Sequence, residues 1–335
     1  MKRNSLVKII IFIFALCLVA GFYLFINLPS PIIISQPFSI AKGESTGSIS
    51  FRLKQDKFIY SDLIFRFYLK LTNSAKDIKA GYYLIPPRVT LINLVNFLTD
   101  NKNINDGIFL IKEGETLKDI ETNLRQHGIL TEITKLSDFK IKDFKDRYPL
   151  LFKDAPIDNN LEGYLFPDSY HFPPNSSAND IIKVLLTNSQ NKLQENKLLD
   201  SNNGHTFYEN LIMASILEKE VQDEIDKRMV ADILWRRFKI NMPLQVDASI
   251  CYAINQSFND CQLSDKAFKI DSPYNTYLYK GLPPAPICNP GLESIKATLN
   301  PLANDSWYYL SDRKTGKTIY SKTLEEHNLA RQKYL

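Results

Sequence analysis

Histidine is scarce in this chain, and its cysteines lack the spacing of a metal site. There are four histidines and four cysteines among 335 residues, and no Cys-x-x-Cys pair, so we expect no structural zinc and no cofactor. The net charge is only +4, which gives no reason to expect nucleic acid as a partner. No internal repeat or low-complexity tract is present. The sequence is therefore not that of a metalloprotein, a nucleic-acid-binding protein or a repeat protein.

Apolar residues are plentiful, and one long run of them lies at the N-terminus. They make up 44% of the chain, enough for two or three folded domains. Lys2, Arg3 and Lys8 precede residues 9–28, which carry no charge and as a helix would cover about 30 Å, enough to cross a bilayer. A cleaved signal peptide is the alternative, but the run is long and ends without a small-x-small site.

We therefore predict an uncleaved transmembrane anchor at residues 9–28. Its basic residues lie on the N-terminal side, so residues 1–8 should be cytoplasmic and everything after Pro29 extracytoplasmic. An exported location permits a disulfide, and Cys251 with Cys261 is the nearest pair in the exported part. Because Cys288 is left over, the sequence does not decide whether a bridge forms.

Mixed helix and strand patterns after the anchor predict an α+β fold. In a membrane-proximal domain of residues 29–106, alternating residues predict a strand at Ser48–Leu53, and a second strand at residues 81–87 ends at prolines. Amphipathic patterns predict helices at Asp62–Leu71 and, capped by Thr90, at residues 90–98. The polar residues 101–106 then form a linker or turn.

A small strand-turn-helix module is predicted at residues 107–158. A strand at Gly107–Gly114 is followed by Thr116 and Asp119, which have the spacing of a capping box, and Gly128 ends the helix. The Glu-Gly-Glu-Thr-Leu sequence in this turn resembles the LysM pattern, which implies a carbohydrate-binding unit. The match covers only the first half of that pattern, and any strand-to-helix turn would fit it equally.

A glutamate in an apolar helix is the strongest candidate for a reactive group in the remaining residues 159–335. If the segment from Leu211 to Ile225 is one helix, its apolar residues surround Glu218, whereas Glu220 falls on the opposite, acidic face. An apolar environment raises the pKa of a carboxyl, as a general acid requires. The alternative is that Glu218 forms an ion pair with a core Lys or Arg.

Further polar and aromatic residues form candidate binding segments. Residues 161–170 are dense in tyrosines and acids without a helical or strand period, which suits a sugar-binding groove as well as a packed loop. Gln245 and Asp247 share a side if their segment is extended. The proline-rich residues 271–291 predict an ordered loop with a binding role. A strand near Trp307–Leu310, a strand at Thr318–Ser321 and a helix from Leu324 end the chain.

Seven sequence blocks resemble the YceG-like family in order and spacing. They are Leu161-Glu-Gly-Tyr-Leu-Phe-Pro-Asp-Ser-Tyr170, Ala214-Ser-Ile-Leu-Glu-Lys-Glu220, Leu244-Gln-Val-Asp247, Ser272-Pro-Tyr-Asn-Thr-Tyr277, Gly281-Leu-Pro-Pro-Ala-Pro-Ile287, Asn289-Pro-Gly291 and Glu326-His-Asn328. The resemblance implies a bacterial inner-membrane endolytic murein transglycosylase, with a LysM-like domain before a mixed α+β catalytic domain at residues 159–335. Ala285, Val246 and Thr318 depart from the usual Gly, Ser or Thr, and His of the family, and Thr318 puts a role for a histidine there in doubt.

The resemblance also implies the chemistry and the partners. The enzyme would cut the MurNAc-GlcNAc β-1,4 bond of peptidoglycan strands, leave a 1,6-anhydroMurNAc end and limit strand length, with peptidoglycan synthases as candidate partners. Glu218 falls at the position that the resemblance assigns to the catalytic acid. We expect the substrate-binding residues to be Glu162, Tyr164, Gln245, Asp247, Tyr274, Asn275 and Tyr277.

Two alternatives remain open at this point. A conventional hydrolase would use Glu218 with a second acid such as Asp247. A non-catalytic peptidoglycan-binding scaffold would need neither. A protease is not supported, because His327 has no serine or cysteine elbow near it in sequence.

Overall fold

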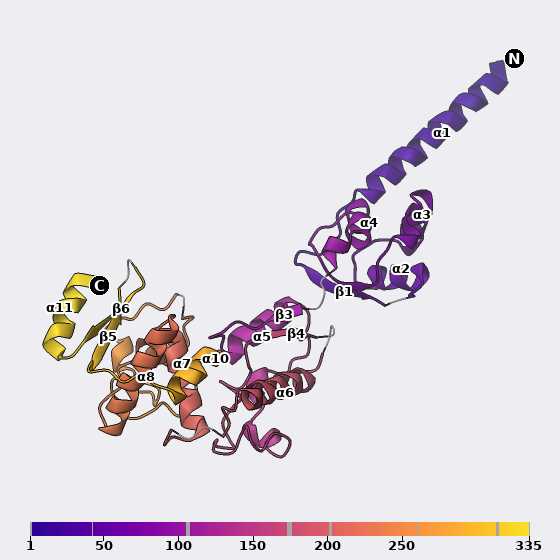
Figure 1. The fold of residues 1–335 in the computed structure, drawn as a ribbon. Helices are drawn as coiled ribbons and strands as arrows, with labels where there is room; N and C mark the ends of the chain where they lie inside the picture. The colour runs from indigo at the N-terminus through magenta and orange to yellow at the C-terminus, as the bar shows by residue number, and fades with distance from the viewer. Residues whose placement is uncertain are drawn as a thin grey trace. The chain divides into compact units, whose positions relative to one another are not determined.

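The computed structural model describes residues 2–334 except 42, 105–107, 173–175, 201–202, 259 and 313–314. The predicted domain boundary at 106/107 and the start of the strand at Gly107 lie outside the described residues. The chain forms two compact units. Unit 1 comprises Met1–Ile108, Gln126–Leu130 and His171–Asn175, and unit 2 comprises Phe109–Arg125, Thr131–Tyr170 and Ser176–Leu335. Helices and short strands occur in both (Figure 1), so the fold is mixed α+β, as predicted.

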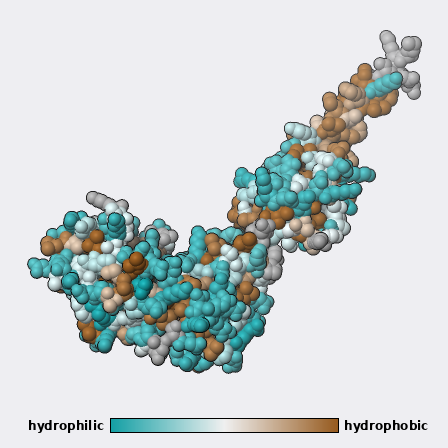
Figure 2. Space-filling view, viewed as in Figure 1, coloured by the Kyte–Doolittle hydropathy of each residue, from teal (hydrophilic) through white to brown (hydrophobic). Residues whose placement is uncertain are grey.

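The first helix, α1 (Lys2–Ile26), contains the predicted apolar run. Its segment Val7–Ile26 is long and apolar enough to cross a membrane, and only 6% of that segment is buried. Figure 2 shows the apolar side chains along this helix in brown. Exposure of so many large apolar residues is unfavourable in water, which is consistent with a membrane environment.

The remainder of unit 1 is a two-stranded sheet with helices. Strand β1 (Gln36–Ile40) pairs antiparallel with β2 (Gly81–Ile85), with Phe38 opposite Tyr83. The helices that share its core are α2 (Thr46–Gln55), α3 (Asp62–Leu71) and α4 (Leu91–Thr99). The β2 strand, α3 and the Thr90 cap of α4 confirm the sequence predictions.

The predicted strand at Ser48–Leu53 is wrong, because this segment lies in α2. Ser45 caps the helix by accepting a hydrogen bond from Ser48 N at 3.2 Å. Ile49 and Leu53, four residues apart, are buried, whereas Phe51 is 57% exposed. The apolar residues Ile49, Phe51 and Leu53 alternate as in a strand, but on the helix Phe51 faces solvent while the other two face the core.

The strand-turn-helix module follows, and most of its residues belong to unit 2. Strand β3 (Ile108–Leu110) pairs with β4 (Ser169–His171) and is followed by α5 (Leu117–Gln126). The predicted capping box is present, since Asp119 Oδ2 accepts from Thr116 N at 3.0 Å and Thr116 Oγ1 accepts from Asp119 N at 3.1 Å. The next long helix is α6 (Ala178–Glu195).

Three packed helices form the centre of unit 2. They are α7 (Phe207–Glu220), α8 (Glu224–Lys239) and α10 (Leu292–Leu299), which lie together in Figure 1. Every residue from Leu211 to Leu217 is buried. A helix that is apolar all round must be covered on every side, so the site at its C-terminal end is held on a rigid element.

The C-terminal part of unit 2 is a hairpin with a helix. Strands β5 (Tyr308–Ser311) and β6 (Thr318–Ser321) pair antiparallel, and α11 (Leu324–Tyr334) follows. All three confirm the sequence predictions. Helix α11 contains no buried residue.

An irregular segment connects α9 (Asp247–Ala253) to α10. Cys251 and Cys261 form a disulfide, which settles the pairing that the sequence left open. The loop 271–291 is ordered without regular structure, as predicted. Its centre is Asn275, which is fully buried and donates to Phe268 O and Ile270 O at 3.0 and 2.9 Å.

Candidate active site

The Glu218 side chain is largely buried, but as half of an ion pair. Its side chain is 8% exposed, and Oε1 lies 3.4 Å from Nζ of Lys227, whose side chain is 4% exposed. Oε2 accepts from Gly291 N at 2.9 Å and from Ser294 Oγ at 2.6 Å. Both oxygens are thus occupied, one by Lys227 and the other by Gly291 and Ser294 at the start of α10. The structure shows the core ion pair rather than the apolar pocket.

The helical-wheel prediction failed because α7 ends at Glu220. Val221 has extended dihedrals, φ −144° and ψ 148°, and α8 begins at Glu224. Ile225 therefore belongs to a different helix and is 59% exposed. The turn brings Lys227 back against Glu218, a contact that no single-helix pattern can predict.

Glu220 faces a cavity, so its predicted place on the acidic surface of the helix is wrong. Oε2 accepts a hydrogen bond from Tyr309 Oη at 3.1 Å. Burial raises the pKa of Glu220 to about 7, and the charge of Asp247 adds to this effect. The Tyr309 and Ala248 hydrogen bonds and the charge of Arg237 act in the opposite direction. Glu220 is therefore available both as an acid and as a base near neutral pH.

The cavity has a volume of about 730 Å³, within the range of small-molecule sites. Its walls come from α7, α8, the 245–247 segment, the 268–277 loop, β5 and α11. The lining residues are Lys219, Glu220, Arg237, Gln245, Asp247, Phe268, Tyr277, Tyr308, Tyr309, Leu310, Ser311, Leu324, His327, Asn328 and Arg331.

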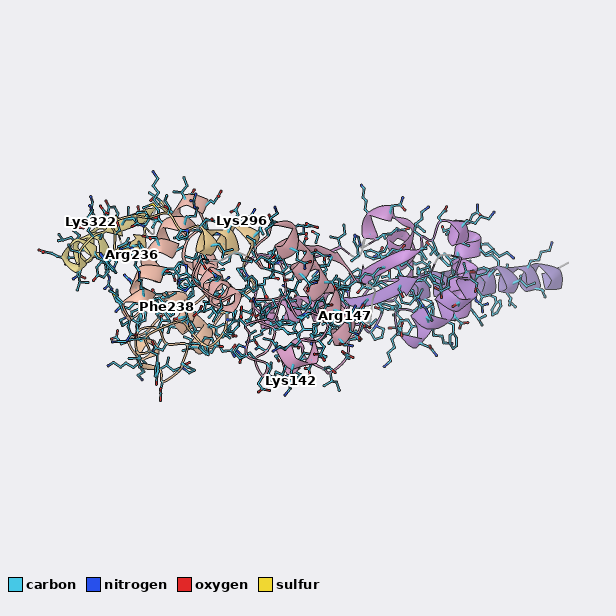
Figure 3. All side chains as sticks on the ribbon, turned by 60° about the horizontal axis from the view of Figure 1, so that its bottom comes forward. Lys142, Arg147, Arg236, Phe238, Lys296 and Lys322 are labelled. Carbon is cyan, nitrogen blue, oxygen red and sulfur yellow. A yellow bond between two sulfur atoms is a disulfide. The ribbon has the colours of Figure 1, made fainter. Side chains whose placement is uncertain are left out.

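Arg237 of α8 connects its helix by hydrogen bonds to two other walls of the cavity, the segment before Gln245 and the segment before β5. It is 4% exposed, donates to Leu244 O at 2.7 Å and donates twice to Trp307 O, at 2.9 and 2.6 Å. Its guanidinium carbon lies 5.1 Å from the centre of the Tyr308 ring. Because it connects α8 to β5 and to the residue before Gln245, Arg237 fixes the shape of the cavity. Its neighbour Arg236, which is labelled in Figure 3, instead donates from Nε to Asp232 Oδ2 at 2.9 Å, one turn earlier on α8.

Three of the predicted substrate-binding residues line the cavity. Asp247 Oδ1 accepts from Tyr277 Oη at 2.5 Å, and Gln245 takes a positive φ of 54°. Gln245 and Asp247 thus reach the same cavity, although the segment is not the extended strand that we assumed. A left-handed residue followed by the start of α9 turns both side chains toward it.

The other four predicted binding residues do not line the cavity. Tyr164 is 1% exposed and packs on Phe152, with ring centres 4.8 Å apart. Asn275 organises its loop, and Tyr274 packs on Tyr252 at 4.9 Å. These three side chains therefore pack within the protein and do not contact the cavity.

Glu162 is 3% exposed, and burial raises its pKa to about 8. It accepts from Leu117 N, at the start of α5, at 3.0 Å and from Asn289 Nδ2 at 3.3 Å. Asn289 also bonds the strand-to-helix turn directly, since its Nδ2 donates to Glu115 O at 2.8 Å and its carbonyl accepts from Gly114 N at 2.8 Å. This turn is thus fixed against the loop that leads into α10.

Several cavity residues were not singled out from the sequence as site residues. Arg237, Tyr308 and Tyr309 come from segments distant in sequence from Glu220, and Arg331 lies near the C-terminus. The advance signal was the Glu326-His-Asn328 block, of which His327 and Asn328 line the cavity. Across the described part of the chain, no group of three or more His, Cys, Asp or Glu side chains is arranged to hold a metal ion.

The fold and the cavity define a class of protein. It has one apolar N-terminal helix and an α+β body in which a carboxyl with a pKa near neutrality lines a tyrosine-rich polar cavity, an arrangement typical of acid–base enzymes. The model of the YceG-like family matches residues 38–333, so the chain belongs to that family.

Known relatives agree with this placement. An endolytic murein transglycosylase of Bacillus subtilis strain 168 is 32% identical over 307 residues, which cover 89% of this chain and 84% of that protein. The endolytic murein transglycosylase of Streptococcus pneumoniae D39 is 28% identical and is covered over 56% of its length. A crystal structure of a YceG-like protein from Listeria monocytogenes, 31% identical, superposes with a TM-score of 0.62 and covers 88% of this chain.

Proposed function

We propose that this protein is an endolytic murein transglycosylase, a lyase that cleaves peptidoglycan strands. The observation that carries the proposal is the position of Glu220: a carboxyl with a pKa of about 7, hydrogen-bonded by Tyr309, in a cavity of about 730 Å³. Membership of a family whose relatives bear that name supports the reaction class.

We assign the acid role to Glu220 rather than to Glu218, which the sequence favoured. A general acid must reach the substrate. Glu220 lines the cavity, whereas both oxygens of Glu218 are held by Lys227 and by the start of α10. Glu218 then positions the last turn of α7.

A single carboxyl can carry out both halves of this reaction. Protonated Glu220 gives its proton to the oxygen of the MurNAc-GlcNAc β-1,4 bond as that bond breaks. The resulting carboxylate takes the proton of the MurNAc C6 hydroxyl, which closes on C1 and leaves a 1,6-anhydro end. Asp247 offers a negative charge near the oxocarbenium-like centre, and Gln245 and Tyr277 offer hydrogen bonds to sugar hydroxyls.

The apolar helix supports a location at the bacterial cytoplasmic membrane. We propose a single-pass anchor with residues 1–8 in the cytoplasm and the rest outside, which is the periplasm in a cell with two membranes. The basic residues that precede the uncharged run 9–28 support this orientation. Nascent strands near the membrane would then be within reach of the cavity, and peptidoglycan synthases remain proposed partners.

The predicted domains are kept as proposals, with a changed role for residues 107–158. The strand, turn and helix fit a LysM-like unit, yet the turn at Gly114 is hydrogen-bonded to Asn289, close in sequence to the residues that hold Glu218. We propose that this module supports the catalytic domain of residues 159–335, and that sugar binding by it is secondary.

Mass spectrometry of digested glycan tests the proposed reaction. The full-length protein in detergent should release fragments with 1,6-anhydroMurNAc ends from purified strands. Fragments with reducing ends would instead identify a conventional hydrolase in which Asp247 or Glu220 activates water. Binding without any cleavage would identify a scaffold. A Glu220→Gln sample is the matched control, because it keeps the size of the side chain and removes the proton.

A further inference from the structure

One face of helix α11 lines the cavity and does not pack into a hydrophobic core. Leu324, His327, Asn328 and Arg331 follow i, i+3, i+4 and i+7 spacing, and all four line the cavity. No residue of α11 is buried, so the pattern does not serve ordinary core packing. The helix is therefore placed as a wall of the site.

Arg331 is the cation on this wall that is free to bind a ligand. Of the other cavity cations, Arg237 is committed to backbone carbonyls, and Lys219 lies 4.3 Å from the centre of the Phe258 ring. Arg331 is exposed, and its guanidinium makes no hydrogen bond or ion pair with any other described residue, the cavity acids Glu220 and Asp247 included.

His327 lies beside Arg331 on the same wall of the cavity. Burial lowers the pKa of His327, one turn earlier on α11, and the charges of Arg331 and Arg237 add to this. His327 stacks on Tyr308 with ring centres 5.3 Å apart, and its Nδ1 is buried without a partner among the described residues. The cavity therefore presents a free guanidinium beside a neutral imidazole, on the wall formed by α11.

We propose that Arg331 binds a carboxylate of the substrate strand and so makes the site selective for strands that carry free carboxylates. A planar guanidinium pairs with a carboxylate through two parallel hydrogen bonds, which gives both affinity and orientation. In peptidoglycan this chemistry has two sources: the lactyl carboxylate of an unsubstituted MurNAc, and the carboxylates of a stem peptide. The inference rests on the proposed function, because it names what the same cavity recognises.

Strand binding tests the proposal without turnover. The full-length protein carrying Glu220→Gln is measured against three glycan preparations: strands with stem peptides, strands from which the peptides have been removed, and peptide-bearing strands whose carboxylates have been converted to methylamides. Arg331→Gln and Arg331→Lys are added to this background. Lys333→Gln is the matched control, because Lys333 is a cation of the same helix that does not line the cavity.

Arg331→Gln should raise the Kd about ten-fold for at least one of the carboxylate-bearing strands, the order expected for a lost charge-assisted contact. It should leave the Kd for methylamide strands unchanged, and Arg331→Lys should recover part of the loss. A loss confined to peptide-bearing strands assigns the stem-peptide carboxylate, and a loss on peptide-free strands assigns the lactyl group. Lys333→Gln should stay within about two-fold throughout.

Two results would overturn the inference: an equal loss on methylamide strands, or no loss on either carboxylate-bearing strand. The proposed function fails separately. A wild-type protein that releases no fragments while Arg331-dependent binding persists would refute the reaction and keep the carboxylate site. Cleavage to anhydro ends together with binding that does not depend on Arg331 would keep the proposed reaction and refute the carboxylate site.

Discussion

The two ends of the Glu-Lys-Glu motif lie in opposite environments. Glu218 is tied to Lys227, Gly291 and Ser294 in a nearly closed ion-pair site. Glu220, two residues on, faces the cavity with Tyr309 and Asp247 as neighbours, and its pKa is about 7. We therefore propose that the same side-chain type is a structural anchor at position 218 and the titrating acid at position 220. Burial alone does not identify a catalytic acid, because both oxygens of a buried carboxyl can be taken up by partners within the protein, as those of Glu218 are.

The largest effect should come from Glu220→Gln. The amide cannot donate a proton to the leaving oxygen, and general acid catalysis typically contributes about 10²–10⁴-fold. Glycan cleavage, measured as anhydro ends released per minute, should fall by at least about a hundred-fold. The thermal transition should stay close to that of the wild type, since removing a partly buried acid with a raised pKa does not strand a charge.

Changes to the Glu218–Lys227 ion pair should lower the free energy of unfolding. Lys227→Met leaves the Glu218 carboxylate buried without its counter-charge, which typically costs about 3–5 kcal/mol. Denaturant unfolding of the full chain in detergent should show a fall of about 3 kcal/mol in the free energy of unfolding of unit 2.

A double variant sharpens this prediction. Glu218→Gln combined with Lys227→Met removes both charges, so it should recover part of the loss of the single variant. If the two single changes simply add, the pair at 3.4 Å does not contribute as an ion pair, and the contrast between the two glutamates is weaker than the geometry indicates.

Changes around Glu220 should move its titration in a known direction. In the proposed mechanism Glu220 acts as an acid below its folded pKa of about 7, so cleavage should decline as the pH rises above that value. The negative charge of Asp247 raises this pKa, so Asp247→Asn should move the decline to lower pH by about one unit. A carbon NMR titration of the labelled carboxyl checks the shift even where the variant is slow. No shift would mean that the charge of Asp247 does not act on Glu220.

The smallest effect is expected for Tyr309→Phe, in the opposite direction. The Tyr309 hydroxyl donates to the Glu220 carboxylate at 3.1 Å and so lowers its pKa. Its loss should move the decline to higher pH by about half a unit. A downward shift would contradict the hydrogen-bond geometry.

Local sequence signals predicted the local structure well. The Thr90 cap, the Thr116–Asp119 box and the β5–β6 hairpin all depend on neighbours within a few residues. The strand predicted at Ser48–Leu53 failed because apolar alternation over so short a run fits a helix as well, and only the exposure of Phe51 distinguishes the two.

The site was less predictable because it depends on distant segments. The helical pattern found Glu218 as buried but could not reveal the end of α7 at Glu220, or Lys227 returning on the next helix. The assignment of Glu220 requires knowledge that Tyr309 and Asp247 converge on it from other parts of the chain. The family resemblance located the motif, and our choice between its two acids is a proposal that depends on the three-dimensional contacts.

The most direct measurement compares Glu218→Gln with Glu220→Gln under one condition. Both full-length variants are assayed on purified glycan strands at a temperature where circular dichroism shows each to be folded, and the anhydro ends are counted by mass spectrometry. We predict that Glu220→Gln loses at least about a hundred-fold in cleavage, whereas folded Glu218→Gln keeps activity within about ten-fold of the wild type and is less stable. Folded Glu218→Gln without activity, beside an active Glu220→Gln, would contradict this assignment of the two glutamates.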